Sequence, residues 1–338
     1  MMEDILNSIV LLTNFLLIPG ITYGCQLALG AMGVTLVYGI LRFSNFAHGE
    51  IMAFGTMFTI LTTWLFTGWG LSLGPLPTAL IALPFGIIAA IVLVLGTDRV
   101  VYKFHRAKRA DPVIYLIASL GVMFFYNGLI RFIIGPDDRQ FRDGERFIIR
   151  ARDFKEWSGL NEGLAFKTTQ GITMLVTALV VFALFWFLNR TRTGKSMRAY
   201  SDNRDLALLS GIDPNRVVLI CWILVAALAT IAGTLYGLDK SFKPFTYLQL
   251  LLPIFAAAIV GGLGSPIGAL VGGFIIALSE TTFTFAFRKI VTYLGPEGYQ
   301  PEGLVQLLST DYKFAVSFAI LVVTLLIRPT GIFRGQSI

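Results

Sequence analysis

The chain has 338 residues, of which 55% are hydrophobic and only 14% are charged, and its mean hydropathy is +0.74. This composition excludes a soluble globular domain and indicates an integral membrane protein. The formal charge of +7 does not indicate a nucleic-acid partner, because lysine and arginine in a membrane protein mark the cytoplasmic loops. Apolar blocks of spanning length predict an all-α polytopic membrane protein with about 8 to 10 transmembrane or half-membrane helices, some of them interrupted.

The first half of the chain begins with a short apolar segment at 5–18, which Pro19-Gly20 is expected to end because proline and glycine break helices. The joint 97–112 is rich in lysine and arginine and is expected in the cytoplasm. That orientation places the segment 135–170 in the periplasm as a partly helical loop. Spanning helices are predicted at 21–41, 51–67, 78–96 and 113–134.

The second half contains a second basic joint at 190–216, also expected in the cytoplasm. The apolar stretch 250–285 is too long for one ordinary span, and its glycine-rich centre predicts two half-length helices. Further spans at 171–188, 217–238 and 313–327 complete a single transmembrane domain over 1–338. This topology places both termini in the cytoplasm.

Polar residues interrupt the apolar sequence between 42 and 50. Lipid makes such groups costly unless they are paired or hydrated. One interpretation is that His48 and Glu50 hydrogen-bond each other or the backbone to stabilise a helix break. The other is that Asn45, His48, Gly49 and Glu50 line a translocation path. A zinc site is not predicted, because the chain has only one other histidine, His105.

A short helix is predicted at 204–209, within the second basic joint. Asp202 or Asn203 can cap it, and Pro214 prevents its continuation. This helix is either a solvated loop element or a docking helix whose apolar side enters a groove on a partner. The residues assigned to docking are Arg198, Arg204, Leu206, Ala207, Leu209 and Gly211.

Gly261, Gly262 and Gly264 form the second predicted helix break. They either permit close helix packing or present backbone groups to a zwitterionic solute. Glu280, near the end of the following helix, is expected to extend to the membrane interface. No cofactor is predicted, since Gly194-Lys195-Ser196 lacks the earlier glycine and the strand of a phosphate-binding loop.

Three stretches of the chain, in order, closely resemble the LivH family of permeases. They are Tyr38 through Glu50, Arg198 through Arg216, and Ala258 through Ala269. The resemblance implies a permease subunit of an ABC importer, not an enzyme, that carries leucine, isoleucine and valine across the bacterial inner membrane. It also implies a second, LivM-like permease subunit, two cytoplasmic ATPase subunits and a periplasmic solute-binding protein. Residues 198–212 would then be the segment that couples the permease to ATP hydrolysis.

Other functions remain open at this point. A sister family for urea and short amides shares the element from Asn45 to Glu50, and another amino acid is a further candidate solute. An intramembrane enzyme would use His48 and Glu50 as an acid and base pair. A structural scaffold would need neither side chain. The charged segment 135–170 departs from the shorter LivH members and is expected to contribute to docking of the binding protein.

Overall fold

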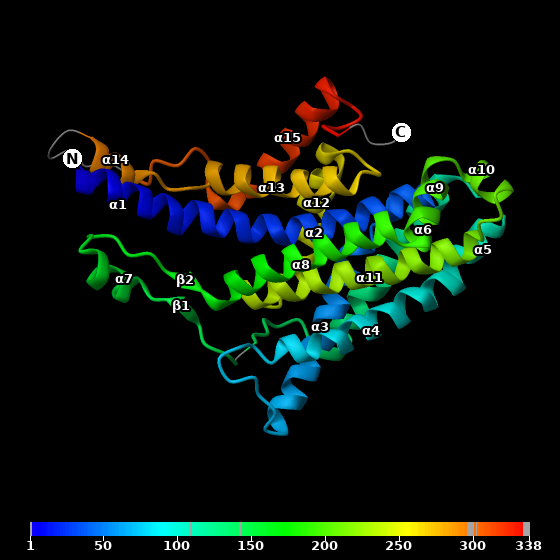
Figure 1. The fold of residues 1–338 in the computed structure, drawn as a ribbon, viewed down its shortest axis with the longest axis horizontal. Coiled ribbons are helices and arrows are strands. Elements are labelled where there is room, and N and C mark those ends of the chain that lie inside the picture. Colours follow the sequence, from blue (N-terminus) through cyan, green and yellow to red (C-terminus); the bar gives the residue numbers. More distant parts are fainter. Residues whose placement is uncertain (1, 109, 142, 296–300, 302, 334–338) are drawn as a thin grey trace.

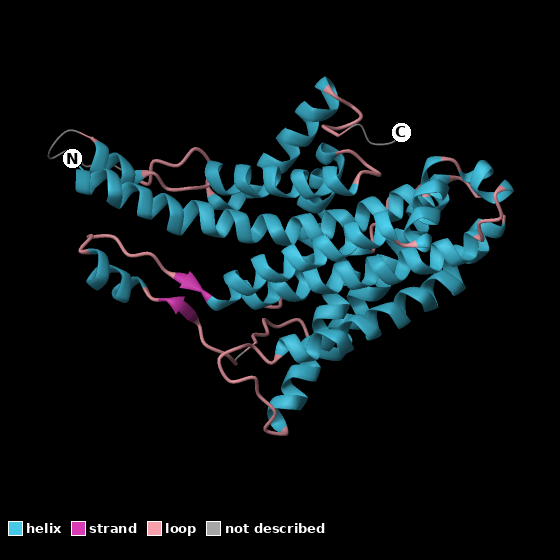
Figure 2. Ribbon diagram, in the orientation of Figure 1, coloured by secondary structure: helices cyan, strands magenta, loops and turns pink. Residues whose placement is uncertain are grey.

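A computed structural model describes residues 2–108, 110–141, 143–295, 301 and 303–333. The protein is an all-α polytopic membrane protein, and nine helices of the described residues are long and apolar enough to cross a membrane (Figures 1 and 2). The helices are α1 (Met2–Leu12), α2 (Ile18–Leu41), α3 (His48–Gly68), α4 (Ala79–Thr97), α5 (Lys103–Ala107), α6 (Pro112–Ile134), α7 (Ala151–Ser158), α8 (Thr168–Arg190), α9 (Arg192–Asp202), α10 (Arg204–Leu209), α11 (Pro214–Asp239), α12 (Pro244–Gly261), α13 (Pro266–Phe283), α14 (Arg288–Leu294) and α15 (Lys313–Ile327).

The N-terminal helix is continuous, so the prediction that Pro19-Gly20 ends a first segment is wrong. The π-helical turn Thr13–Leu17 joins α1 to α2, and together they form one helix of 40 residues. A proline inside a helix lacks an N–H and presses on the carbonyl four residues earlier. The wider turn lies at that position and accommodates the ring without ending the helix. Gly20 then packs against Leu278 of α13.

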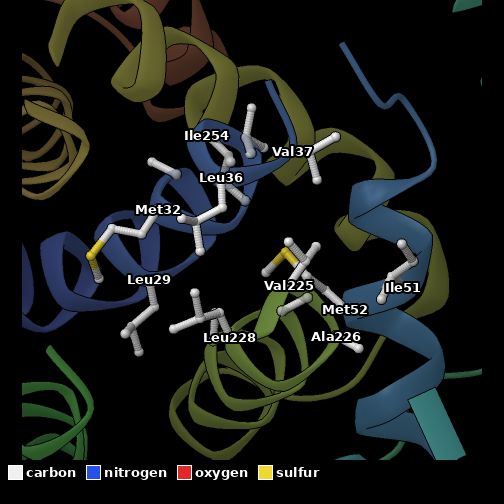
Figure 3. Close-up of a cluster of buried hydrophobic side chains, with 14 of the residues drawn as sticks. Leu29, Met32, Leu36, Val37, Ile51, Met52, Val225, Ala226, Leu228 and Ile254 are labelled. Atoms are coloured by element: carbon white, nitrogen blue, oxygen red, sulfur yellow. The ribbon is translucent and has the colours of Figure 1, made fainter. Parts of the chain in front are cut away.

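The core lies where α2 and α11 pass through the centre of the bundle. Both helices are apolar on nearly every side, as expected for helices surrounded by other helices. Figure 3 shows side chains from α2, α3, α11 and α12 meeting in this core, among them Leu29, Met32, Met52, Leu228 and Ile254, all of which are buried. The candidate functional residues lie on α2 and α11 or on the helices and loops that pack around them.

One end of the bundle, which we call the cap end, carries α1, α7 and α14. A two-stranded antiparallel sheet, β1 (Phe147–Ile149) with β2 (Phe166–Lys167), supports α7. Glu162 Oε1 accepts hydrogen bonds from Lys289 Nζ at 2.9 Å and from the Tyr293 hydroxyl at 3.1 Å. The Glu162 backbone N–H donates to Asn7 Oδ1 at 3.0 Å. These bonds fasten the loop after α7 to α14 and to the N-terminal helix.

The opposite end, which we call the α10 end, carries α5, α9 and α10 (Figure 1). The C-terminal described residues also lie here, because the N–H groups of Ile332 and Phe333 donate to the carbonyls of Val260 and Gly261, at 2.9 and 3.1 Å. Met2 and Phe333 therefore lie at opposite ends of the bundle, whereas the sequence predicted both termini on the cytoplasmic side. The uninterrupted N-terminal helix removes one crossing and places Met2 at the cap end.

Candidate functional site

Residues 42–47 form an irregular segment that penetrates the helix bundle. The Phe46 N–H donates to Ser119 Oγ of α6 at 3.2 Å. Helix α3 begins at His48, and the His48 side chain lies against Gly33 of α2. Ser119 and Gly33 are each about two turns inside their own helices. The first predicted break is thus irregular backbone at depth, which membrane proteins tolerate only where protein or a water-filled cavity surrounds it.

Asn45 shapes the start of α3. Its side chain is 3% exposed, and its Oδ1 accepts hydrogen bonds from the Ala47 N–H at 3.1 Å and from the Tyr102 hydroxyl at 3.3 Å. The first of these bonds is the local turn that asparagine favours at helix entrances. Its Nδ2 has no hydrogen-bond partner among the described residues. Asn45 therefore retains two free donor positions inside the bundle.

His48 and Gly49 lie between α2 and α12. His48 is completely buried beside the backbone of Gly30, and neither of its ring nitrogens forms a hydrogen bond of normal geometry with a described residue. A β-carbon added at Gly33 would lie 2.6 Å from His48 Cε1, so only glycine leaves room for the imidazole. A β-carbon at Gly49 would lie 2.7 Å from the carbonyl oxygen of Tyr247 in α12. These contacts fix the first turn of α3 against two neighbouring helices.

Glu50 is also completely buried and is paired with α6. Its Oε1 accepts a hydrogen bond of 2.8 Å from Asn127 Nδ2, while no described residue bonds its Oε2. The partner of Glu50 is thus Asn127 and not His48. Sequence reasoning missed Asn127, which shares the span predicted at 113–134 with Ser119 and Arg131. Its intramembrane position was the available signal, since polar residues in such spans commonly mark functional sites.

The second break, between α12 and α13, has a different character. Gly262 and Gly264 have positive φ values of 111° and 88°, and the backbones of Gly261 and Gly268 are in direct contact. Ser265 caps α13 by accepting a hydrogen bond from the Gly268 N–H at 3.1 Å. The two helices have 18 residues each and are long enough to span, so the prediction of half-length helices is wrong.

The structure separates the two predicted groups of path residues. Gly49 contacts Tyr247 in the first turn of α12, whereas Gly261 is the last residue of that helix. At 1.5 Å per residue these positions are about 20 Å apart along α12. Gly264 instead lines a cavity of about 250 Å³ with Gly39, Arg198 and Ser201 at the α10 end. The glycine break therefore adjoins α9 and not the polar residues of the first break.

The predicted short helix is present as α10. Asn203 caps it by accepting a hydrogen bond from the Leu206 N–H at 3.0 Å, and Gly211, with φ of 79°, follows its end. Leu206 and Leu209 are 61% and 85% exposed, but Ala207 is only 3% exposed. The expected apolar docking side therefore contains the two leucines, whereas Ala207 points into the bundle. Helical geometry explains this split, because adjacent residues are about 100° apart around the axis.

The neighbouring helix α9 contacts the end of α2. Ser201 Oγ donates to the Gly39 carbonyl at 3.0 Å, and Arg42 donates to the Ser201 carbonyl at 2.6 Å. Arg198 donates to Asn189 Oδ1 at 2.9 Å, and the Arg204 guanidinium lies 5.5 Å from the centre of the Tyr200 ring. Burial raises the pKa of Tyr200, although the charge of Arg204 opposes this shift. Displacement of α9 would therefore act directly on α2.

Glu280 does not extend to the membrane interface as expected. Its side chain is 2% exposed and accepts a hydrogen bond from Ser317 Oγ of α15. The bond connects α13 to α15, the candidate span with the smallest buried share. A buried hydrogen bond of a carboxylate is a strong interaction, which explains why the side chain stays inside.

Comparison with known proteins identifies the family. Residues 16–325 match the model of the branched-chain amino acid transport system permease component. The chain belongs to this permease family. It is 30% identical to the high-affinity branched-chain amino acid permease protein LivH of Salmonella typhimurium over 324 residues, which are 93% of this chain and 92% of that protein. It is 29% identical to BraD of Pseudomonas aeruginosa, with 94% of both chains covered.

A probable LivH permease of Methanocaldococcus jannaschii is 29% identical, over 92% of this chain and 90% of the relative. The protein is thus a transport subunit and not an enzyme, and its spanning helices make it a multi-pass membrane permease. The buried polar residues of this permease therefore need an explanation in terms of transport.

Proposed function

We propose that this permease forms part of the translocation path of an ABC importer for leucine, isoleucine and valine. The observation that supports the path is the irregular segment 42–47, which enters the bundle beside buried polar atoms without partners. These atoms are Asn45 Nδ2, both ring nitrogens of His48, and Glu50 Oε2. Unpaired polar groups in an apolar interior are costly, so water or solute is expected to contact them during transport.

The solute follows from the relatives, whose names specify branched-chain amino acids. The alternatives are urea, a short amide or another amino acid. In the proposed assembly, a second, LivM-like permease subunit completes the path. A periplasmic binding protein delivers the solute, and two cytoplasmic ATPase subunits supply the energy.

The orientation we propose places the α10 end in the cytoplasm of the inner membrane. The basic joints 97–112 and 190–216 both lie at this end, where Arg106 and Arg204 line one cavity of about 390 Å³. Lysine and arginine accumulate in cytoplasmic loops. The cap end then faces the periplasm, with the N-terminal helix starting there and residues 331–333 on the cytoplasmic side.

Coupling to the ATPase would use α9 and α10. Leu206 and Leu209 offer an exposed apolar surface, and Arg198 and Arg204 lie on the same two helices. Gly211 ends α10 and allows the chain to turn into α11. Because α9 is bonded to the end of α2, a push on α10 would reach the segment that leads into the first break.

Uptake measurements test the proposed solute. Labelled leucine and labelled urea, each at low concentration, are supplied to matched cells with and without this gene. Loss of leucine uptake alone supports the proposal. Loss of urea uptake alone would assign the chain to the sister function, and unchanged uptake of both solutes would contradict both.

A further inference from the structure

A second polar cavity lies at the cap end, away from the segment 42–50. Its volume is about 390 Å³, and its walls come from the loop before α4, residues 140–141 and 143–146, the start of α8 and the end of α11. Among the described residues, three acidic and three basic side chains line it, namely Asp143, Glu145, Asp239, Arg146, Lys167 and Lys240. Such a balance suits a ligand with both charges better than a simple anion or cation.

The segment 135–146 is tied in place around this cavity. Arg139 and Phe242 exchange two backbone hydrogen bonds, of 2.8 and 2.7 Å, which attach the segment to the joint between α11 and α12. The Glu145 N–H donates to the carbonyl of Pro75 at 2.9 Å, and Asp143 Oδ2 accepts from the Thr78 N–H at 2.5 Å. These three attachments hold the walls in place, so the cavity is pre-formed, as ligand sites usually are.

Two carboxylates in its walls have unused hydrogen-bonding capacity. The Asp239 side chain is only 7% exposed, and its Oδ2 lies 3.5 Å from Lys240 Nζ. Its Oδ1, like Asp143 Oδ1, is buried without a hydrogen-bond partner among the described residues. A buried carboxylate oxygen without a donor is costly, and an incoming ammonium group would supply one.

The remaining walls supply cations and apolar surface. In the described structure, neither Lys167 nor Arg146 forms an ion pair, so both are available to a carboxylate. Phe141, Leu238 and Pro77 contribute apolar atoms to the same cavity. An ammonium group, a carboxylate and a short aliphatic side chain are the three parts of a branched-chain amino acid.

We propose that this cavity is an entry site that binds a zwitterionic aliphatic α-amino acid before it reaches the buried polar segment 42–50. Asp239 receives the ammonium group, and Lys167 with Arg146 receives the carboxylate. This inference rests on the proposed function, because it assumes that the solute is an amino acid. It adds a site on the permease itself that holds the solute after release from the binding protein.

Direct binding to the purified permease assembly, without the binding protein, tests the site. The probes are leucine, leucinamide, which lacks the carboxylate, and 4-methylpentanoate, which lacks the ammonium group. We expect Asp239→Asn to weaken binding of leucine and leucinamide at least about tenfold, while 4-methylpentanoate binding is unchanged. Lys167→Gln should weaken leucine and 4-methylpentanoate and leave leucinamide unchanged.

Asp138→Asn is the matched control, because it removes the same charge from an exposed position on the same segment outside the cavity. The opposed patterns of the two variants separate loss of contact from misfolding, which would weaken all three probes alike. One outcome would contradict the entry site alone. In it, the wild-type assembly transports leucine, and Asp239→Asn and Lys167→Gln bind all three probes as tightly as the wild type does, so the proposed function stands. If the wild type neither transports nor binds leucine, both are wrong.

Discussion

The two helix breaks of this permease both place irregular backbone among the spanning helices, but they are built from different residues. Residues 42–47 interrupt the chain with polar side chains whose hydrogen-bonding capacity is only partly used. The break at 262–265 contains glycines, and its neighbours Gly261, Gly268 and Gly272 bring α12 and α13 into backbone contact. The first break has side chains available for solute and water. The second has only Leu263 and Ser265 as side chains, and the close packing around it holds two spanning helices together.

The C-terminal residues add to this contrast. Residues 331–333 cover the end of α12, and Ile332 and Phe333 satisfy two of its terminal carbonyls. Within the described part of the chain, no comparable segment covers the first break, and Glu50 accepts a hydrogen bond through only one oxygen. We expect substitutions that change the polarity or charge of side chains at the first break to affect transport. Substitutions that add side-chain volume at the second break should affect stability.

The largest expected effect comes from adding volume at the second break. Gly261→Val would force side-chain atoms into the backbone of Gly268 and should destabilise the permease by about 3 kcal/mol or more. The measurement is the yield and thermal midpoint of the monodisperse permease after extraction from membranes. Gly96→Val is the control, because nothing lies within 4 Å of a β-carbon at Gly96. Equal yields for both variants would contradict the proposed role of the close contact.

A change of charge at the first break should affect transport instead. Glu50→Gln keeps an oxygen that can accept the Asn127 hydrogen bond, so the thermal midpoint should change little. Leucine uptake should fall at least about tenfold, which corresponds to the loss of one interaction with a charged group. Glu3→Gln, at an exposed position of α1 to which no role is assigned, is the matched control. Normal uptake by Glu50→Gln would show that the carboxylate only serves packing.

The proposed docking of the ATPase on α10 can be tested by substitutions on the two faces of this helix. Leu209→Glu changes an 85% exposed side chain, so the permease should fold normally but co-purify several-fold less ATPase, because a charge replaces apolar docking surface. Ala207→Glu would bury a charge and should reduce the yield of folded protein itself. Co-purification and extraction yield, measured for both variants, distinguish the two faces of the helix. Undiminished ATPase recovery with Leu209→Glu would contradict docking through this face.

The smallest expected effect concerns the cover of the second break. Gly331 has φ of 75°, and an added β-carbon would lie 2.5 Å from Gly262 Cα. Gly331→Ala should lower stability by about 1 kcal/mol, because alanine disfavours this conformation and the contact must open. A thermal midpoint a few degrees below the wild type, with uptake retained, is the expected result. An unchanged midpoint would show that the cover contributes nothing to stability.

The sequence was sufficient for the features that depend on local chemistry. Apolar length predicted the spanning helices, and the order of Asn203, Gly211 and Pro214 predicted α10 with its cap. It failed where the backbone geometry of a single turn or a contact between distant residues decides the outcome. The π turn before Pro19 keeps the first helix intact, and the facing glycines allow α12 and α13 to run side by side at full length.

The candidate site likewise combines residues that the sequence reveals with residues that only the fold reveals. Asn45, His48 and Glu50 stand out in the sequence because they interrupt an apolar run. Asn127 and Tyr102 are less conspicuous, since their roles depend on the hydrogen bonds that they form across the bundle. Likewise, only the fold brings Asp143 and Asp239 to one cavity, because they are distant in the chain and joined through the bridge between Arg139 and Phe242.

The uninterrupted N-terminal helix has a consequence for the height of the molecule. Its 40 residues measure about 60 Å, roughly twice the hydrocarbon thickness of a bilayer. Tilts of spanning helices rarely exceed about 40°, so tilt alone cannot fit this length into lipid. Part of the helix must therefore extend beyond the hydrocarbon layer. Its first turns are fastened to α14 and to the loop after α7, so these three elements are held together as one unit at the cap end.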